Sequence, residues 1–557
     1  MALNGVNPFP KEFVDLYYKN RWWSGITLGE MIDRTSRLYP HKEALVAGDV
    51  RLTYEQLREW TDRAAIVFLE LGIRGGDRVL LQSPNWVEFV HAYYGLYKIG
   101  AVPVMCIPRY SQRDMEHFCK VTEAKAWMVP LRYEKIDYLP MIESLRAHQP
   151  HLKHILVIDP TGQKEKPLPE GTVSFNELLQ KVDLKKYSKD TLQPFRPDPE
   201  QVCHFMPTGG TTGLPKLVPR THADYLCNVE YRAMAWERST RDIFLIATPV
   251  THNMAIEVGM NPTFLTGGKV VMITSTRPKE ILEAIERERV TMMILVVAQL
   301  QQIMEFPDLK QFDLSSLQKI AGAGSHVPAE LIKKVYGKIG CKFYNVFGMS
   351  EGPCTQTRYE DLEDVVLHTV GWPICPYDEF KVIDADGKAL PLENDGELVA
   401  RGPCIFRGYF KAEAENREAF TPDGFFRTGD IAKFDKHGHL IITGRKKDII
   451  IRGGENISAL EVEELISSFS KVDQIAAVGM PDPILGERVC AFIKPKNNEV
   501  VSLEEIVSYL KEKKTTVLYL PERIEILEEM PLTNVGKVDK KRLREEIKEK
   551  LKKEGKI

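Results

Sequence analysis

The sequence predicts an α/β protein with a large N-terminal domain of α/β subdomains, a small β-rich subdomain and a small α+β C-terminal domain. Strand-like and helical patterns alternate over residues 77–107 and again over 241–350, as is typical of parallel sheets covered by helices. After residue 370 the chain changes to short strands and Asp-Gly turns, and a fresh α/β pattern starts beyond 448. At 557 residues the chain is too long for one core.

The N-terminal elements follow from apolar periodicity and from glycine breakers. Apolar positions at helical spacing run from Leu52 to Leu71 and end at glycines. Strands are expected at 77–82 and 101–107, on either side of a buried helix over 86–99. The segment 159–200, rich in Pro, Lys and Asp, is expected to be a surface connection. Six aromatic residues are expected to pack the N-terminus onto the body: Phe9, Phe13, Tyr17, Tyr18, Trp22 and Trp23.

A compact polar break at 445–448 indicates a hinge between a domain over 1–444 and a domain over 449–557. The second half of the first domain should contain strands near 243, 270, 292, 319 and 342, and the last domain should contain helices from Ala459 and Leu503. Near the C-terminus, Leu543, Ile547 and Leu551 recur at i, i+4 and i+8. Their mixed-charge surroundings favour a solvated helix docked by one stripe over a membrane-surface helix.

Composition excludes several classes of protein. Hydrophobic residues make up 43% and charged residues 27% of the chain, and the net charge is −3, so nothing predicts binding to nucleic acid or to an anionic membrane. The nine cysteines are scattered without a zinc-binding spacing, which suits reduced thiols in a cytoplasm. The N-terminus shows no secretion signal, and the longest apolar stretches are too short to span a membrane. A cytoplasmic protein is expected.

The strongest chemical signal is a loop that is rich in glycine and threonine. It follows an apolar strand over 202–206 and reads Thr208-Gly209-Gly210-Thr211-Thr212-Gly213-Leu-Pro-Lys216. Exposed backbone N–H groups, hydroxyls and one ammonium together suit a polyphosphate, although an ordinary surface loop can have the same composition. A Walker A loop requires glycine directly before the lysine, and Leu-Pro stands there instead. A conventional P-loop NTPase is therefore disfavoured.

Four weaker signals lie at turns further along the chain, and each has a purely structural alternative. Glu351, in the turn after a predicted strand, suits Mg²⁺, which prefers oxygen ligands. Asp430, after Thr428-Gly429, could accept from ribose hydroxyls or could form an ordinary Asx turn. Arg445 lies at the polar junction, and Lys537 lies in a Gly-Lys turn. Gly322-Ala323-Gly324 lacks the third glycine of a dinucleotide fingerprint.

Together, in this order, these motifs resemble the core motifs of the ANL superfamily of adenylate-forming enzymes, over about residues 8–550. Within that superfamily the chain looks most like stand-alone aryl-acid adenylating enzymes, such as 2,3-dihydroxybenzoate–AMP ligase. The resemblance implies a C-terminal domain that is mobile between two half-reactions. In the first, the carboxylate attacks the α-phosphate of ATP and pyrophosphate leaves. In the second, the thiol of coenzyme A or of a carrier protein's phosphopantetheine displaces AMP.

The resemblance also implies a role for each matching residue. Thr208 to Lys216 would hold the β- and γ-phosphates, Glu351 would hold Mg²⁺, and Lys537 would be the catalytic lysine that bridges the carboxylate and the α-phosphate. The adenine would lie against Gly322, Ala323 and Gly324 and against Val346, Phe347, Gly348, Met349 and Ser350. Asp430 would bind the ribose, Arg445 would bind ribose or phosphate, and Lys447 would be the hinge residue. The acid would contact His252, Asn253, Val258 and Gly324.

The chain departs from the dihydroxybenzoate pattern after His252-Asn253, where the serines expected to receive the ring hydroxyls are missing. Met254, Ile256 and Val258 predict a mostly apolar pocket instead, while Glu257 either points away from it or meets a basic group. The junction Arg452-Gly-Gly-Glu-Asn-Ile is a form associated with coenzyme A synthetases and favours coenzyme A modestly. A carrier-loading ligase stays open as the alternative, and a catalytically silent nucleotide-binding regulator as a remote one.

Overall fold

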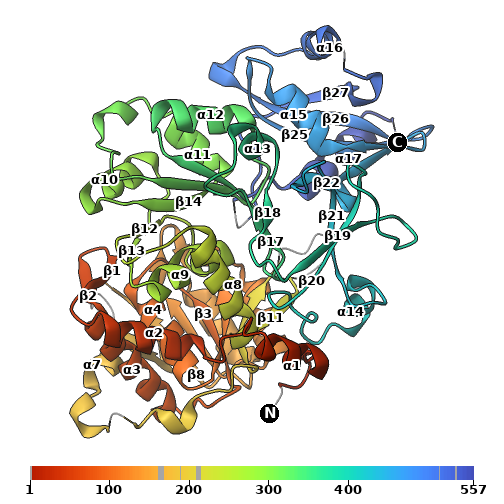
Figure 1. The fold of residues 1–557 in the computed structure, drawn as a ribbon. Coiled ribbons are helices and arrows are strands. Elements are labelled where there is room, and N and C mark those ends of the chain that lie inside the picture. Colours follow the sequence, from red (N-terminus) through yellow and green to blue (C-terminus); the bar gives the residue numbers. More distant parts are fainter. Residues whose placement is uncertain are drawn as a thin grey trace. The chain divides into compact units, whose positions relative to one another are not determined.

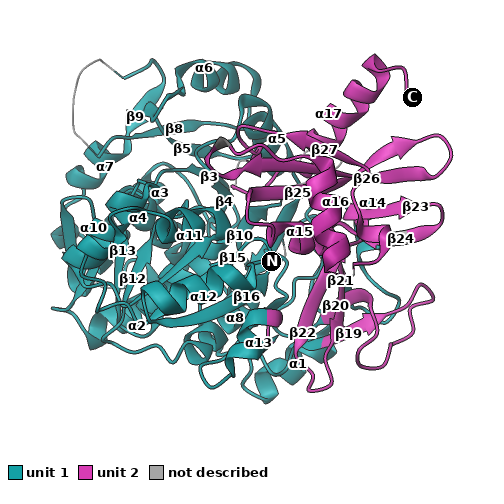
Figure 2. Ribbon diagram, turned by 90° about the horizontal axis from the view of Figure 1, so that it is seen from above, with its two compact units in different colours: residues 1–367, 372–379, 401–426 teal, residues 368–371, 380–400, 427–557 magenta. Residues whose placement is uncertain are grey.

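The computed structural model describes residues 3–160, 168–188, 190–208, 215–513, 515–533 and 536–556. The chain divides into two compact units, coloured teal and magenta in Figure 2. The first comprises residues 1–367, 372–379 and 401–426, and the second comprises 368–371, 380–400 and 427–557. Figure 1 labels their elements. The large unit thus takes up most of the predicted N-terminal domain.

A seven-stranded sheet forms one half of the large unit, in the order β11-β10-β4-β3-β5-β8-β9. All neighbours are parallel except β10 and β11, which form an antiparallel pair. Its strands are β3 (Arg78–Gln82), β4 (Val102–Cys106), β5 (Ala126–Pro130), β8 (His154–Ile158), β9 (Thr172–Ser174), β10 (Val202–Pro207) and β11 (Leu217–Thr221). The accompanying helices are α3 (Tyr54–Glu70), α4 (Val87–Lys98), α5 (Gln112–Thr122), α6 (Leu139–His148) and α7 (Phe175–Lys181).

The predicted helix over 86–99 is confirmed as α4, and every one of its residues is buried. The expectation of a plain surface connection over 159–200 is wrong in part. This segment contains β9, which extends the sheet, and α7, whose Phe175 and Leu179 are buried. Three apolar side chains on a seven-residue helix were too short a pattern to stand out among the surrounding Lys, Asp and Pro.

A nine-stranded sheet forms the other half, in the order β18-β17-β16-β15-β14-β12-β13-β1-β2. The central strands are parallel, as the alternating pattern over 241–350 predicts. They are β1 (Glu43–Ala47), β2 (Val50–Thr53), β12 (Ile243–Ile246), β13 (Lys269–Met272), β14 (Met292–Val296), β15 (Lys319–Ala323), β16 (Lys342–Gly348), β17 (Cys354–Gln356) and β18 (Trp372–Pro373).

Helices of the nine-stranded half build a large apolar core against this sheet. They include α10 (Pro278–Glu288), α11 (Val297–Met304), α12 (Ala329–Lys338) and α13 (Glu363–His368). Helices α2 (Leu28–Leu38), α8 (His222–Ala235) and α9 (Asn261–Leu265) belong to the same unit, together with α1 (Lys11–Lys19) and α14 (Glu413–Ala419). The N-terminal aromatic residues pack as predicted, in a cluster with Ala223 and Cys227 of α8.

The second unit holds two antiparallel-rich sheets. The first has the order β19-β20-β21-β22 and the second has the order β24-β23-β26-β25, with β27 added to β26. Their strands are β19 (Glu379–Ile383), β20 (Gly396–Arg401), β21 (Phe426–Phe434), β22 (Leu440–Arg445), β23 (Ile449–Arg452), β24 (Glu455–Ser458), β25 (Val472–Asp482), β26 (Gly486–Pro495) and β27 (Arg523–Ile526). The helices are α15 (Ala459–Ser467), α16 (Leu503–Glu512) and α17 (Lys540–Lys553).

The final helix packs by one stripe, as the sequence predicts. Leu543 and Ile547 are fully buried and Leu551 nearly so, in a core shared with β25 and β26. Among the described residues, every helix is too short or too polar to cross a lipid bilayer. The division at 445–448 stays a prediction, because β19 to β22 fall in the same compact unit as the C-terminal elements.

Candidate active site

The glycine- and threonine-rich loop joins the ends of an antiparallel pair of strands. Pro207 at the end of β10 pairs with Leu217 at the start of β11. Beyond that pair, the Thr208 backbone N–H donates to the Lys216 carbonyl at 2.8 Å. Gly209, Gly210, Thr211, Thr212 and Gly213 lie outside the described residues, so their predicted role is untested. What the structure does place is the base of the loop, with Lys216 at its edge.

One tyrosine bridges the lysine of this loop and the predicted metal-binding glutamate. The Lys216 ammonium lies 4.6 Å from the centroid of the Tyr409 ring, within the range of a cation–π contact. The Tyr409 hydroxyl donates to Glu351 Oε1 at 2.8 Å. Lys216 and Glu351, which are far apart in the sequence, therefore share one neighbour. Sequence analysis did not single out Tyr409.

Glu351 has the donor chemistry that a Mg²⁺ ion requires. Its side chain is buried, and a carboxylate offers the hard oxygen ligands that Mg²⁺ takes together with substrate phosphates. Mg²⁺ keeps several waters and takes one or two protein carboxylates. A single glutamate that shares Tyr409 with Lys216 of the glycine- and threonine-rich loop therefore fits the ion.

The turn that carries Glu351 is held from behind by a buried arginine. Arg220 has no exposed surface, and it donates to the Ser350 carbonyl at 2.9 Å and to the Cys404 carbonyl at 2.8 Å. Asp224 accepts from its Nε at 2.8 Å and balances its charge. Gly352 lies at φ +117°, and a Cβ there would come within 2.0 Å of the Cys404 oxygen. The turn can form only with glycine at this position.

One predicted acid-binding residue, Asn253, is connected to the same arginine through Tyr225. Asn253 Oδ1 accepts from the Tyr225 hydroxyl at 2.9 Å, and the Arg220 guanidinium stacks 5.2 Å from the Tyr225 ring centroid. Burial raises the pKa of Tyr225 well above its usual value, so its hydroxyl stays a donor. The His252 Nδ1 accepts from the Met254 backbone N–H at 3.2 Å, which orients the ring.

Met254–Met260 form a π-helix that begins directly after Asn253. This conformation was not foreseen, and π-helical turns are frequent at functional sites. The segment is buried, Val258 included. Glu257 meets a basic group, one of the two possibilities raised by the sequence, because Arg232 Nε donates to its carboxylate at 3.2 Å. Its charge is therefore balanced inside the protein.

The two predicted adenine-contacting stretches come from neighbouring parallel strands. Gly322 of β15 pairs with Asn345 of β16. Ala323 ends β15 and Gly348 ends β16, so Gly324 and Met349 follow at the same edge. Ligands of open α/β sheets bind at the carboxyl ends of the strands. Gly322 is also a packing position, since a Cβ there would lie 2.8 Å from Phe343 and Val327.

In the second unit, Asp430 and Arg445 face each other across two strands. They pair directly between β21 and β22, and Arg445 Nε donates to Asp430 Oδ1 at 2.6 Å. Asp430 is only 2% exposed. Its Oδ2 is buried and accepts no hydrogen bond from the described residues. A buried acceptor without a donor costs stability unless a ligand supplies one, as ribose hydroxyls can.

The remaining predicted residues of this unit lie on turns. Lys537 is exposed in a tight turn, in which the Thr533 backbone N–H donates to its carbonyl at 2.7 Å. Gly536 before it has φ +80°. Lys447 lies in a single helical turn over Lys446–Asp448, and Arg544 of α17 donates to its carbonyl at 3.3 Å. The site assigned to these residues stays a prediction.

A hollow of about 310 Å³ opens elsewhere in the large unit. It is lined by residues of α8 and α9 and their flanks: Glu230, Ala233, Met234, Glu237, Arg238, Leu265 and Thr266. None of these is a predicted site residue. The hollow therefore gives no support to the acid pocket expected around Val258.

Comparison with known proteins identifies the family. The model of the AMP-binding enzymes matches residues 32–410, and the model of the AMP-binding enzyme C-terminal domain matches residues 461–537. The chain is an adenylate-forming ligase of the ANL superfamily. The expected class of fold is thereby confirmed, with its large α/β N-terminal part, its small β subdomain and its C-terminal domain.

Several relatives that match along nearly the whole chain are named after the aryl acids on which they act. The chain is 36% identical to the 2,3-dihydroxybenzoate-AMP ligase of Bacillus subtilis (strain 168), covering 99% of each chain. It is 36% identical to the 2-hydroxy-7-methoxy-5-methyl-1-naphthoate–CoA ligase of Streptomyces carzinostaticus, with 97% of this chain and 96% of the relative covered. It is 34% identical to the salicyl-AMP ligase/salicyl-S-ArCP synthetase of Mycobacterium tuberculosis, with 97% and 94% covered.

One solved structure matches the fold of this chain along nearly its whole length. The apo structure of Mycobacterium smegmatis MbtA superimposes with a TM-score of 0.72 at 34% identity, covering 98% of this chain and 99% of that chain. The relatives thus include both AMP ligases and CoA ligases. Their names favour the carrier-loading alternative over the coenzyme A preference derived from the sequence.

Proposed function

We propose that the protein activates an aryl carboxylic acid with ATP and passes the acyl group to the phosphopantetheine thiol of a carrier protein. The observation that carries this proposal is the Lys216–Tyr409–Glu351 arrangement at the base of the glycine-rich loop. It brings an ammonium and a carboxylate together where a polyphosphate would have to be bound. In a member of the ANL superfamily, this is the charge pattern that adenylation requires.

The chemistry has two balanced steps. A carboxylate oxygen attacks the α-phosphorus of ATP, the bond to the bridging oxygen of pyrophosphate breaks, and aryl-AMP forms. The thiol sulfur then attacks the carbonyl carbon, its proton is lost, and AMP leaves. Two anions meet in the first step, so charge repulsion and poor orientation form the barrier.

This chain's own residues address that barrier. Lys216 and the base of the loop bind the β- and γ-phosphates. Glu351, oriented by Tyr409, would hold the metal ion, and Mg²⁺ there would neutralise phosphate charge. Asp430 accepts from the ribose hydroxyls through its buried Oδ2. Lys537 is the residue proposed to bridge the carboxylate and the α-phosphate.

The acid is bound beside the segment His252–Val258. Asn253, oriented by Tyr225, offers an amide group to a ring substituent, and the buried apolar π-helix suits a flat hydrophobic ring. The missing serines disfavour a dihydroxylated ring. The relatives' names support the aryl class, since they specify dihydroxybenzoate, naphthoate and salicylate.

Coenzyme A is the second candidate acceptor. It is favoured by the form of the junction Arg452–Ile457 and by the CoA ligase among the relatives. The carrier protein is favoured by the relative named salicyl-S-ArCP synthetase. Both acceptors present the same phosphopantetheine thiol. The enzyme must therefore distinguish them by the rest of the acceptor, which is a nucleotide in coenzyme A and a folded protein in the carrier.

Acid-dependent ATP–pyrophosphate exchange across benzoates, hydroxybenzoates, aminobenzoates and heteroaromatic acids tests the activation step. The proposal predicts exchange with members of this panel and none with long-chain fatty acids. Exchange with fatty acids alone would refute the aryl assignment. AMP release is then followed with coenzyme A and, separately, with a panel of phosphopantetheinylated aryl carrier proteins. Turnover with a carrier and little with coenzyme A supports the proposed acceptor, and the reverse result selects the second candidate.

A further inference from the structure

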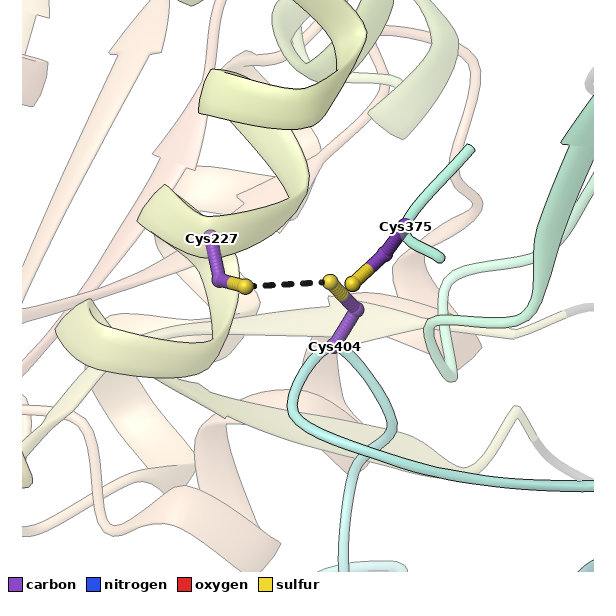
Figure 3. A group of neighbouring side chains, drawn as sticks. All are labelled: Cys227, Cys375 and Cys404. Carbon is purple, nitrogen blue, oxygen red and sulfur yellow. Dashed lines mark hydrogen bonds between the residues drawn. The ribbon is translucent and has the colours of Figure 1, made fainter. Parts of the chain in front are cut away.

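Three cysteines that lie far apart in the sequence meet inside the large unit. Cys227 lies on α8, Cys375 follows β18 and Cys404 follows β20 (Figure 3). All three are buried, with exposures of 1%, 0% and 0%. Their sulfur atoms lie within 4.8 Å of one another, and the Cys404 and Cys227 sulfurs are 3.3 Å apart. The three cysteines form no short sequence motif. For that reason the sequence predicted only scattered thiols.

We propose that Cys227, Cys375 and Cys404 bind a structural zinc ion, and that the neighbouring Asp378 turns its carboxylate toward them as the fourth ligand. Thiolates at about 2.3 Å from one tetrahedral zinc ion lie about 3.8 Å from each other. The Cys227–Cys404 separation of 3.3 Å is somewhat shorter, and all three sulfurs lie within 4.8 Å of one another. A disulfide requires about 2.05 Å between sulfurs, so the Cys227–Cys404 pair at 3.3 Å is not one.

Asp378 supplies an independent indication of a ligand. Its carboxylate is 6% exposed, and its Oδ2 accepts no hydrogen bond from the described residues. Its Oδ1 accepts from the Cys404 backbone N–H at 3.1 Å, and its own N–H donates to the Cys375 carbonyl at 3.2 Å. The carboxylate also interacts with the Cys404 side chain. Its buried Oδ2, on a residue that contacts Cys375 and Cys404, is a donor available to a metal ion.

The backbone makes room for this carboxylate. A Cβ at Gly402 would lie 2.2 Å from Asp378 Oδ1, so only glycine allows the approach. The cluster is closed from outside by Tyr17 and Trp23, and Trp23 Nε1 donates to the Pro403 carbonyl at 2.9 Å. Burial of all three thiols is typical of structural rather than catalytic zinc sites.

The site would brace the turn that carries Glu351. The carbonyl of Cys404 accepts from Arg220, which also donates to Ser350. Two residues further along, the Phe406 N–H donates to the Glu351 carbonyl at 2.8 Å. Fixing Cys404 to α8 therefore fixes the loop against which the Glu351 turn is built. Zinc has no catalytic part in this proposal.

Zinc content measured by mass spectrometry tests the proposal. The full-length wild type, expressed with added zinc and passed through metal-free buffer, should retain about one zinc ion per chain. Cys375→Ser should lose affinity by more than about 100-fold, since losing even an outer partner of a zinc site typically costs 10–100-fold. Asp378→Asn should bind at least about 10-fold more weakly. The matched control Cys119→Ser alters a buried cysteine of the same unit that lies outside the cluster and should retain zinc.

Cobalt substitution gives a readout that requires no variant. Co²⁺ bound by three thiolates in a tetrahedral site should give the wild type a sulfur-to-cobalt charge-transfer band and visible ligand-field bands. A wild type that retains no more zinc than Cys375→Ser and lacks these bands refutes the site. Intact-mass evidence for a Cys227–Cys404 disulfide in the purified protein would also overturn it.

Discussion

Replacing Tyr409 with phenylalanine removes one hydrogen bond from the candidate site and keeps the ring. The lost bond is the 2.8 Å contact to Glu351 Oε1. Hydrogen bonds to charged groups contribute about 1.5–3 kcal/mol, and about 1.4 kcal/mol corresponds to a factor of ten. The kcat/KM for ATP–pyrophosphate exchange should therefore fall about 10–100-fold, and half-maximal activity should require more Mg²⁺, because Glu351 loses its orienting partner.

Tyr409→Leu extends the test to the contact with Lys216. It removes the ring that lies 4.6 Å from the ammonium, and cation–π contacts contribute about 0.5–2 kcal/mol. A further loss of about 2–30-fold is expected, expressed mainly in the KM for ATP. Tyr359→Phe is the control, since Tyr359 is 52% exposed and should exchange at the wild-type rate. If Tyr409→Phe exchanges normally with unchanged Mg²⁺ dependence, the Lys216–Tyr409–Glu351 arrangement has no part in adenylation.

Three further outcomes are expected. Lys537→Ala should slow adenylation about 10²–10³-fold and spare thioester formation from supplied aryl-AMP; equal losses in both half-reactions would contradict its role. Asp430→Asn should raise the KM for ATP about 10-fold or more, measured by exchange at varied ATP, and an unchanged KM would exclude ribose binding. Gly352→Ala should destabilise the protein by about 2 kcal/mol or more and lower its thermal midpoint, whereas Gly337→Ala, in an open helical position, should not lower it.

Much of the fold was predictable because its signals are local. The strand over 202–206, the buried helix over 86–99 and the docked stripe of Leu543, Ile547 and Leu551 each follow from side-chain periodicity within one segment. The π-helix over Met254–Met260 was not predictable, because a run of buried apolar residues does not distinguish one helical hydrogen-bond pattern from another. The short helix α7 was missed because its seven residues span only about two turns, too few to show a helical period.

The residues of the candidate site also fall into two groups, those with a local sequence signal and those without one. Lys216, Glu351, Asp430 and Lys537 lie in short motifs that together, in their order, resemble those of the family, so their roles could be predicted from the sequence. Tyr409, Arg220 and Tyr225 act through partners more than a hundred residues away or on other elements, and an isolated tyrosine or arginine carries no such information. The three clustered cysteines illustrate the same limit, since only the packing of α8 against two loops brings them together.

Direct detection of the products formed without any thiol tests the central claim most directly. The protein is incubated with ATP, Mg²⁺ and the acid that supports the fastest exchange, and the products are separated and weighed by mass spectrometry. The proposed function predicts enzyme-bound aryl-AMP and pyrophosphate in equal amounts, with AMP appearing only after a phosphopantetheine thiol is added. Formation of ADP and phosphate, or cleavage of ATP that does not depend on the acid, would contradict it.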